Sequence, residues 1–197
     1  MTTTYTPALS PEEYLVRERA AEYRSEYLAG GVRAMTGASR RHNRIAMNVG
    51  VLLHAQLRGG PCEPFMSDMR VKVERTGAYF YPDVVVACDG SRLEDEHEDT
   101  LLNPTLIVEV LSPSTADYDH SAKWEHYRRI PTLTDYLLLS QDEARIERYA
   151  RQSEGLWLFS ETVGLDAALR LDSIGCTLAL RDVYERVLSS GAAVQPE

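Results

Sequence analysis

Two acidic residues and one lysine stand at the end of, or just after, apolar segments of the chain. Asp83 precedes Val-Val-Val-Ala, Glu109 lies within Leu-Ile-Val-Glu-Val-Leu, and Lys123 follows a Ser-Ala pair. The β-branched residues around the two acids predict strands, so a sheet would place both carboxylates. A buried carboxylate is costly unless a charge meets it, and a divalent cation would supply that charge. Two acids that share a cation, with a lysine directed at the same point, are the minimum for metal-assisted attack of water on a phosphodiester.

The strand period places Glu109 on a covered face. Alternation directs Ile107, Glu109 and Leu111 to one side of their strand and the intervening residues to the other side. Asp83 follows Pro82, which cannot donate a ladder hydrogen bond and suits the beginning or edge of a strand. We therefore expect Glu109 at a covered position and Asp83 at an accessible strand end.

Lys123 has a functional and a structural interpretation. Of the 21 Lys and Arg residues in the chain, only Lys72 and Lys123 are lysines, so arginine is used wherever a plain positive charge suffices. A lysine can shift its pKa and approach a water molecule as a compact donor, whereas a guanidinium stays protonated and needs more room. The alternative is an intrahelical ion pair with Asp119, four residues earlier. Lys72 shows that a lysine can also be retained by chance.

Two helices are predicted in the N-terminal part. Ser10-Pro-Glu-Glu13 has the spacing of a capping box, and the helix that it opens can run to about residue 28, before Gly30-Gly31 stops it. Ser39 is the expected N-cap of a second helix, whose apolar residues recur at helical spacing up to Gly59-Gly60-Pro61.

The rest of the chain predicts strands around one central helix and a short last helix. Pro131 ends the central helix because the residue before a proline is pushed out of the helical region. Together these elements indicate an α+β (mixed α/β) fold, with helices flanking one sheet. The predicted strands cover 69–73, 80–87, 106–111, 135–140, 144–150, 157–161 and 168–171, the last three as a meander, and the predicted helices cover about 118–129 and 180–188, followed by a polar tail.

Length and composition indicate a single domain over residues 1–197. A chain of this length can bury roughly 70% of its unfolded surface without disulfide support. Cys62, Cys88 and Cys176 lie far apart, with neither the paired spacing of a zinc site nor the density of a secreted scaffold, so we expect a reducing cytoplasm. The N-terminus lacks the basic and apolar regions of a signal peptide, and no segment approaches the roughly 18 apolar residues of a membrane span.

The net charge of −9 is not that of a conventional nucleic-acid binder, which is usually basic. The acidic run over 94–99 is most simply a solvated loop. Arginines gather instead around the predicted start of the second helix, at Arg33, Arg40, Arg41 and Arg44. They could receive a phosphate there together with the helix dipole, or form an ordinary exposed arginine face.

His42 and Asp68 are further candidates. His42 lies early in the second helix, where a histidine is as often a capping or packing residue as a functional one. Asp68 follows Ser67 ahead of a strand, a position typical of turn formers, so we leave it outside the catalytic set. The remaining histidines have no ligand spacing, and no serine or cysteine has the setting of an activated nucleophile, which argues against a covalent mechanism.

Several motifs in a fixed order resemble a known family. They are Tyr81-Pro-Asp83, then Ile107-Val-Glu109-Val-Leu-Ser-Pro-Ser-Thr115, and then Asp119-His-Ser-Ala-Lys123-Trp-Glu-His-Tyr127. An opening segment, Ser25-Glu26-Tyr-Leu-Ala-Gly30, and a closing one, Ile174-Gly-Cys-Thr-Leu178, extend the match to nearly the whole chain. With these motifs the chain resembles the Uma-two family of restriction-endonuclease-like proteins in the PD-(D/E)XK nuclease superfamily.

The resemblance implies a restriction-endonuclease-like core, a mixed sheet flanked by helices, with a catalytic edge that holds magnesium or manganese. It also implies that Asp83 and Glu109 are metal ligands, that Lys123 orients or activates the water, and that Glu26, on the first helix, is an auxiliary acid near the metal. The chain departs from the superfamily at Leu111, two residues after the second acid, where a lysine is usual. Lys123 is then the substitute, supplied by the following helix.

The expected function is a magnesium-dependent endodeoxyribonuclease, with DNA as its substrate and no membrane partner. Two copies of one site related by a two-fold axis cut both strands of a duplex most easily, so we also expect a symmetric homodimer. The alternative is a catalytically silent nuclease fold that serves as a binding or scaffold module, which the acidic composition would suit.

Overall fold

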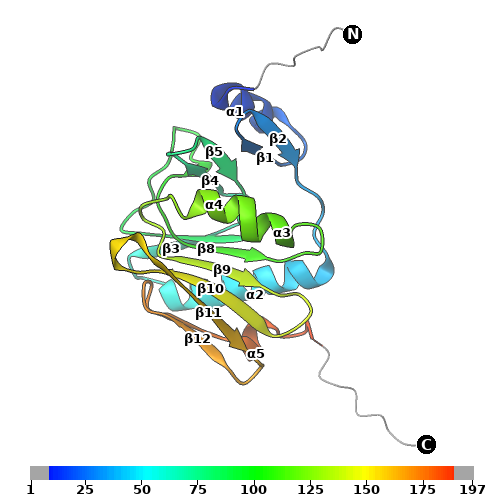
Figure 1. Cartoon of the computed structure of the whole chain (residues 1–197), viewed down its shortest axis with the longest axis vertical. Coiled ribbons are helices and arrows are strands. Elements are labelled where there is room, and N and C mark those ends of the chain that lie inside the picture. Colours follow the sequence, from blue (N-terminus) through cyan, green and yellow to red (C-terminus); the bar gives the residue numbers. More distant parts are fainter. Residues whose placement is uncertain (1–8, 189–197) are drawn as a thin grey trace, which may run out of the picture.

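A six-stranded mixed sheet organises the computed structural model, which describes residues 9–188 (Figure 1). The strand order is β11-β10-β9-β8-β6-β3, and the only parallel neighbours within this sheet are β8 and β9. Parallel neighbours need a crossover connection, and a helical segment supplies it here. The strands are β3 (Cys62–Met66), β6 (Val84–Cys88), β8 (Pro104–Val110), β9 (Asp135–Leu139), β10 (Arg145–Arg151) and β11 (Trp157–Val163).

The two faces of this sheet carry separate cores. Leu106, Val108 and Val110 of β8 pack on the face covered by α2 (Arg40–Leu57), whereas Ile107 packs on the opposite face, beneath the crossover segment (Figure 1). The predicted alternation of the central strand is therefore confirmed. The α2 face is completed by β12 (Ala168–Leu171), β13 (Cys176–Ala179) and α5 (Leu180–Val183).

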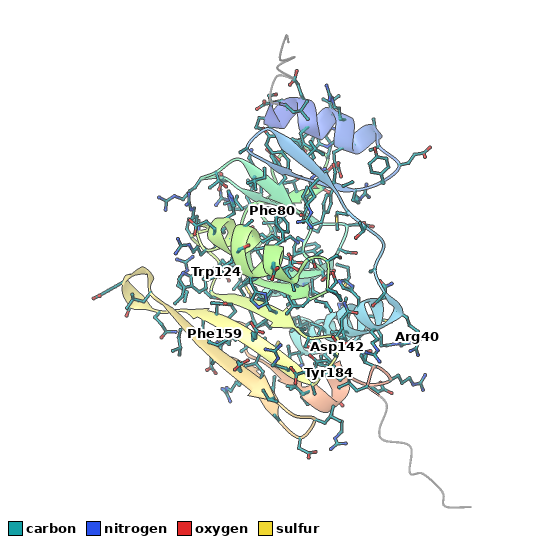
Figure 2. All side chains as sticks on the ribbon, turned by 45° about the vertical axis from the view of Figure 1, so that its right-hand side comes forward. Arg40, Phe80, Trp124, Asp142, Phe159 and Tyr184 are labelled. Atoms are coloured by element: carbon teal, nitrogen blue, oxygen red, sulfur yellow. A yellow bond between two sulfur atoms is a disulfide. The ribbon has the colours of Figure 1, made fainter. Side chains whose placement is uncertain are left out.

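The crossover from β8 to β9 is one helical stretch with a π-helical turn in its middle. It consists of α3 (Ala116–Tyr118), the π-helical turn (Asp119–Lys123) and α4 (Trp124–Tyr127). Trp124, labelled in Figure 2, anchors the stretch to the sheet by stacking on Tyr136, with ring centroids 5.6 Å apart. The predicted central helix is thus confirmed, with an earlier start and an earlier end. π-Helical turns are rare and are frequently found at functional sites.

A second sheet, in the order β2-β1-β5-β4-β7, carries the N-terminal helix. Tyr14 of that helix stacks on Tyr27 and contacts Tyr79, so an aromatic cluster joins the helix to the sheet. The elements are α1 (Pro11–Ala20), β1 (Ser25–Leu28), β2 (Gly31–Ala34), β4 (Arg70–Val73), β5 (Ala78–Phe80) and β7 (Thr100–Leu101).

The structure corrects the predicted first helix. Its capping box at Ser10 is present, but the helix ends at Ala20 instead of near residue 28. Residues 25–28 form β1, because Ala29 and Gly30 adopt positive φ angles of 49° and 85° and turn the chain into an antiparallel hairpin with β2. Glu26 consequently lies on a strand.

Other predicted elements also change. The expected strand over 80–87 is split into β5 and β6 by Tyr81-Pro82-Asp83, and these two strands belong to different sheets. The expected single sheet is therefore three, since β12 also pairs with β13 instead of extending the meander. The second helix with its Ser39 cap is confirmed. The last helix is shorter than expected, and the polar tail lies outside the described residues.

Within the described part of the chain, no helix is both long and apolar enough to cross a membrane.

Cys62 and Cys88 form a disulfide between β3 and β6, where they are direct partners in the strand register. This corrects the expectation that the fold has no disulfide. Disulfides persist mainly in oxidising compartments, so the cysteines give no support to the expected reducing environment. Cys176 is free and buried.

Candidate active site

Asp83 and Glu109 are brought together by the register of β6 and β8. Val84 opposes Val108 in this antiparallel pair, so the next step of the same register sets Asp83 across from Glu109. Glu109 is 3% exposed, as expected for a covered position, whereas the Asp83 side chain is 14% exposed and lines a cleft. The two predicted acids are therefore neighbours at one end of the central sheet.

Lys123 lies at the centre of a buried acidic cluster. Its Nζ is 3.0 Å from Glu26 Oε1, 3.0 Å from Glu109 Oε1 and 3.3 Å from Asp119 Oδ1. All four side chains are buried. The predicted pair with Asp119 exists, but it does not lie on a solvated helix face. The described geometry thus brings together the four residues Glu26, Asp83, Glu109 and Lys123 that the sequence singled out, and it adds Asp119.

Burial and neighbouring charges both shift the pKa values in this cluster, and they oppose each other at Glu109 and at Lys123. Burial raises the pKa of Glu109 well above its usual value, although the Lys123 ammonium opposes the shift. Burial also acts to lower the pKa of Lys123, but the attraction of Glu109, Glu26 and Asp119 outweighs it and the pKa is raised well above the usual value. Lys123 is therefore a charged ammonium that compensates part of an excess of carboxylates.

Two tyrosines of the crossover segment complete the surroundings of Glu109 and Lys123. The Tyr127 hydroxyl donates a hydrogen bond to Glu109 Oε1 at 3.1 Å, and burial raises the pKa of that hydroxyl well above its usual range. Burial, followed by the charge of Glu26, raises the pKa of Tyr118 to about 12. The Arg33 guanidinium lies 4.0 Å from the centre of the Tyr118 ring, within the range of a cation–π contact.

Asp83 is held by a backbone amide and by His42. Its Oδ2 atom accepts a hydrogen bond from the Val110 amide at 2.7 Å and lies 3.1 Å from His42 Nε2. His42 reaches this point from the first turn of α2. The histidine that sequence reasoning leaves open is therefore in direct contact with a predicted metal ligand. The sequence offers two signals for it: its position early in a helix capped by Ser39, and its place in the segment from Met35 to His42 that is similar to the opening of the resembled family.

Glu18 of α1 organises the backbone on both sides of the site. Its carboxylate accepts hydrogen bonds from the Ser25 amide at 2.8 Å, from the Ser25 hydroxyl and from the Tyr81 hydroxyl at 3.1 Å. Ser25 directly precedes Glu26, and Tyr81 stands two residues before Asp83. One carboxylate thus fixes the strand of Glu26 relative to the segment of Asp83.

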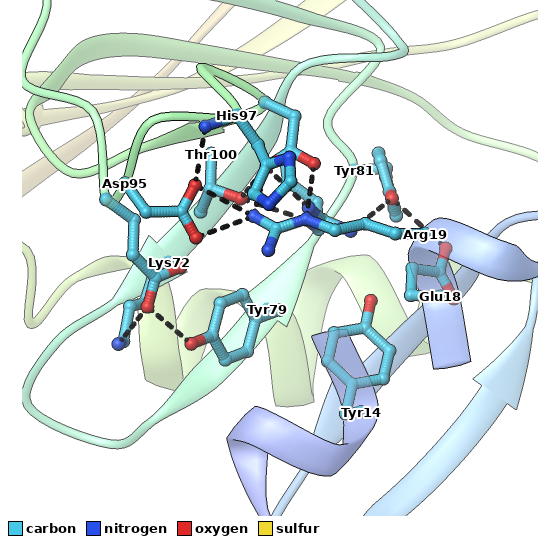
Figure 3. A network of polar contacts seen from close by, with 12 residues as sticks. Tyr14, Glu18, Arg19, Lys72, Tyr79, Tyr81, Asp95, His97 and Thr100 are labelled. Atoms are coloured by element: carbon cyan, nitrogen blue, oxygen red, sulfur yellow. Dashed lines mark hydrogen bonds and ion pairs between the residues drawn. The ribbon is translucent and has the colours of Figure 1, made fainter. Parts of the chain in front are cut away.

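A wider polar network supports this arrangement (Figure 3). Arg70 donates to the Tyr81 hydroxyl at 3.0 Å and pairs with Asp99, and Arg19 of α1 pairs with both Asp99 and Asp95. The acidic run predicted as a plain solvated loop therefore receives two arginines, one of which is 2% exposed. The network attaches α1 to the body of the fold.

The site opens into a cleft of about 1040 Å³. Arg33, Arg40 and Arg44 line this cleft, so three of the four clustered arginines face the acidic site. Arg41 instead pairs with Asp142 at 3.2 Å, and both side chains are largely exposed (Figure 2 labels Arg40 and Asp142 at this end of the molecule). The cleft therefore combines an acidic floor with a basic rim.

The chemistry of the acidic floor fits a hard divalent cation. Among residues 9–188 no group of three or more His, Cys, Asp or Glu side chains is arranged around a common metal position. The carboxylates of Glu26, Glu109 and Asp119 converge on the Lys123 ammonium instead. Two of their buried oxygens, Glu26 Oε1 and Asp119 Oδ1, contact only this ammonium among the described polar groups, at 3.0 Å and 3.3 Å and without hydrogen-bond geometry. Three carboxylates that share one ammonium, in a cluster with excess negative charge, suit Mg²⁺ or Mn²⁺.

Neither Asp68 nor any of the other four histidines lines the cleft. His120 contacts Glu147, and His126 contacts Thr76. Asp68 lies 3.5 Å from Arg24 and is 83% exposed at its side chain, which agrees with leaving it outside the catalytic set.

The chain is similar in sequence to a known protein family and to individual proteins. The sequence profile of the Uma2 family, described as "Putative restriction endonuclease", matches residues 11–181. The chain is 38% identical over 169 residues to the uncharacterized protein sll1609 of Synechocystis sp., covering 86% of this chain and 96% of that protein. It is likewise 38% identical over 178 residues to the uncharacterized protein slr1290 of the same organism, covering 90% and 92%.

A solved structure shares the fold. A crystal structure from Anabaena variabilis, titled as a putative nuclease belonging to DUF820, superposes with a TM-score of 0.74 and 18% sequence identity, covering 91% of this chain and 99% of that one. The mixed α+β architecture with flanking helices, predicted from the sequence, is therefore confirmed by a known structure.

Proposed function

Since this chain belongs to the Uma2 family, which is described as "Putative restriction endonuclease", we propose that it is a divalent-metal-dependent endonuclease that hydrolyses phosphodiester bonds in DNA. One observation carries the proposal. The ammonium of Lys123 is buried among Glu26, Glu109 and Asp119, next to Asp83, at the floor of an arginine-rimmed cleft.

This cluster is difficult to explain as a device for stability. Taking several charges out of water costs several kcal/mol for each ion, and well-packed apolar residues usually serve a core better. Perturbed ionisable groups gathered in a cleft are instead typical of functional sites. The family premise and the electrostatics therefore favour the same interpretation.

Asp83 and Glu109 would hold the cation, Mg²⁺ or Mn²⁺. When bound, the cation would lower the pKa of a coordinated water and neutralise charge on the phosphate. Asp83 offers its Oδ1 atom, because Oδ2 already accepts a hydrogen bond from the Val110 amide and contacts His42. Glu109 is oriented by the Tyr127 hydroxyl and by Lys123.

Lys123 and Glu26 would act beside the metal ligands. The Lys123 ammonium brings three N–H donors into the site, and it can donate to the attacking water or to a phosphate oxygen. Glu26, on β1 of the second sheet, contacts this ammonium, and its carboxylate can also accept a hydrogen bond from the same water. In this proposal Lys123 orients groups and stabilises charge.

The DNA backbone would lie along the rim of the cleft. Arg33, Arg40 and Arg44 present guanidinium groups there, and phosphate contacts of this kind supply most of the non-specific affinity of DNA-binding proteins. A local basic rim can bind DNA although the chain as a whole carries −9.

A direct test uses purified protein with supercoiled, linear and single-stranded DNA, in millimolar Mg²⁺ or Mn²⁺ and in parallel with a chelator. We expect nicked or shortened products only with the cation. Binding to DNA without any cleavage in either metal would overturn the endonuclease proposal and favour the silent nuclease-fold module. The melting temperature should also rise with metal concentration, because a ligand of the native state stabilises it by mass action.

A further inference from the structure

A closed ring of four hydrogen bonds and one contact between His42 and Asp83 joins Asp83 to the strand that carries Glu109. It begins at the Val110 amide, passes through Asp83 and three further polar side chains, and returns to the carbonyl of Leu111. The three side chains are those of His42, Ser39 and Gln141.

The first half of the ring holds the Asp83 carboxylate. Oδ2 accepts from the Val110 amide at 2.7 Å and lies 3.1 Å from His42 Nε2, which must be the protonated nitrogen because a carboxylate oxygen can only accept. The same oxygen therefore has two donors. His42 lies in the first turn of α2, so the start of this helix determines where its imidazole meets Asp83.

The second half of the ring fixes the start of α2. The Ser39 hydroxyl accepts from the His42 amide at 3.0 Å and donates to Gln141 Oε1 at 2.5 Å. The Gln141 amide donates to the Leu111 carbonyl at 2.7 Å. The four hydrogen bonds run with consistent polarity, Gln141 is 8% exposed, and the buried Nδ1 atom of His42 makes no hydrogen bond. The ring thus closes on Leu111, the residue next to Val110.

We infer that Ser39, His42 and Gln141 are positioning residues that hold Asp83 in the orientation needed to bind a metal ion. This inference rests on the proposed function. With Oδ2 occupied by two donors, Asp83 is left with Oδ1 for the cation, and its carboxylate cannot rotate without breaking the ring. Residues that orient a metal ligand in this way typically change metal affinity 10- to 100-fold when they are removed.

Helix capping alone does not account for the ring. Ser39 would cap α2 equally well without Gln141, because the capping bond is the one that it accepts from the His42 amide. Gln141 contributes no cap, and its side chain connects α2 to the end of β8. The fold offers a matched comparison in Gln56, which connects the same helix to Thr177 of β13, far along the helix from the site.

The test compares Gln141→Leu and Ser39→Ala with the control Gln56→Leu. Mn²⁺ binding is measured by titration calorimetry and by the electron paramagnetic resonance of free Mn²⁺, with melting temperature recorded for each variant. We expect the Mn²⁺ dissociation constant to rise about tenfold or more for both ring variants. Ser39→Thr keeps the hydroxyl and should restore wild-type affinity, and Gln56→Leu should bind like the wild type.

The double variant Ser39→Ala/Gln141→Leu shows whether the two residues act together in one ring or independently of each other. Since a ring is broken by the first substitution, the second should add little to the loss of affinity. Folded ring variants that bind Mn²⁺ as tightly as the wild type would overturn the inference, as would an equal loss in Gln56→Leu. A wild-type protein that binds no Mn²⁺ would overturn the proposed function, and the inference with it.

Discussion

Lys123 Nζ lies 3.0 Å from Glu109 Oε1, although the two residues are 14 positions apart and belong to different elements. Glu109 is on β8, and Lys123 closes the π-helical turn of the crossover that follows. The position two residues after Glu109 is occupied by Leu111, whose carbonyl accepts a hydrogen bond from Gln141. The crossover helix therefore delivers to the acid the charge that the strand itself does not carry.

Neutral, isosteric variants of the two predicted metal ligands should lose cleavage. Asp83→Asn and Glu109→Gln keep the size of each side chain but remove its charge, so each should reduce cation-dependent turnover by at least about a hundredfold. A plasmid-nicking assay with Mg²⁺ measures this. Asp68→Asn, at an exposed aspartate outside the site, is the matched control. Wild-type cutting by either ligand variant would contradict the shared-metal interpretation.

Where the sequence carries strong local signals, it predicts this fold well. The second helix, with its Ser39 cap, and the β8 strand around Glu109 follow from period and capping chemistry that each segment contains by itself. The first helix is predicted too long because residues 25–28 have no local signal against a helix. Their strand conformation is decided by pairing with β5 and by the hydrogen bonds from Ser25 to Glu18.

In the site, too, some features follow from local sequence signals and others depend on tertiary packing. Residue type and position predict Asp83, Glu109 and Lys123, and the spacing of Asp119 from Lys123 predicts their ion pair. The contact between His42 and Asp83 depends on how α2 packs against the end of the sheet, which no local pattern specifies. The disulfide of Cys62 with Cys88 depends likewise on the register of β3 with β6.

The ion pair between His120 and Glu147 should depend on pH. Burial acts to lower the pKa of His120, but hydrogen bonds to the Ala116 carbonyl and to Glu147 outweigh it and raise the pKa above its usual value. A raised histidine pKa contributes stability below about pH 6.5, and that contribution is lost as the pH rises through the folded-state pKa.

A double-mutant cycle with His120→Gln and Glu147→Gln measures this coupling. Because the histidine is partly exposed, we expect only about 0.5 kcal/mol at pH 5.5 and less at pH 8.5, from urea unfolding at both values. A coupling that grows with pH would contradict the assignment.

The protein should form a symmetric homodimer when it cuts duplex DNA. Two copies related by a two-fold axis place one site on each strand. Sedimentation velocity at micromolar concentration, with and without a short duplex and in the presence of Ca²⁺ to slow cleavage, should give twice the mass of one chain. A single-chain mass that DNA does not change would count against this expectation.

The arginines of the cleft should bind phosphate, and their neighbour Arg41 should not. In a Glu109→Gln background, which prevents cleavage, Arg40→Ala and Arg44→Ala should each weaken DNA binding. Each should also reduce the slope of log affinity against log salt by about 0.9 for every phosphate that is no longer neutralised. Arg41→Ala is the matched control, since Arg41 pairs with Asp142 outside the cleft. Equal salt slopes for all three variants would remove the arginines from the DNA interface.

Replacing Lys123 separates its electrostatic role from its catalytic role. Lys123→Met leaves Glu26, Glu109 and Asp119 buried without a cation, so the free energy of unfolding should fall by about 3–5 kcal/mol at pH 8. The pKa values of Glu109 and Asp119 are already raised by burial. These acids are protonated more readily than free ones, so the penalty should shrink as the pH falls towards 5.

Lys123→Arg retains the positive charge in the same cluster, and therefore most of the stability. If Lys123 orients the attacking water or the phosphate, the larger planar guanidinium should misplace it, and turnover should fall about a hundredfold or more while DNA affinity stays near that of the wild type. The measurement compares single-turnover cleavage, DNA affinity and melting temperature for the Arg and Met variants. An arginine variant that cuts like the wild type would remove Lys123 from the catalytic set and leave a site built on acids and metal alone.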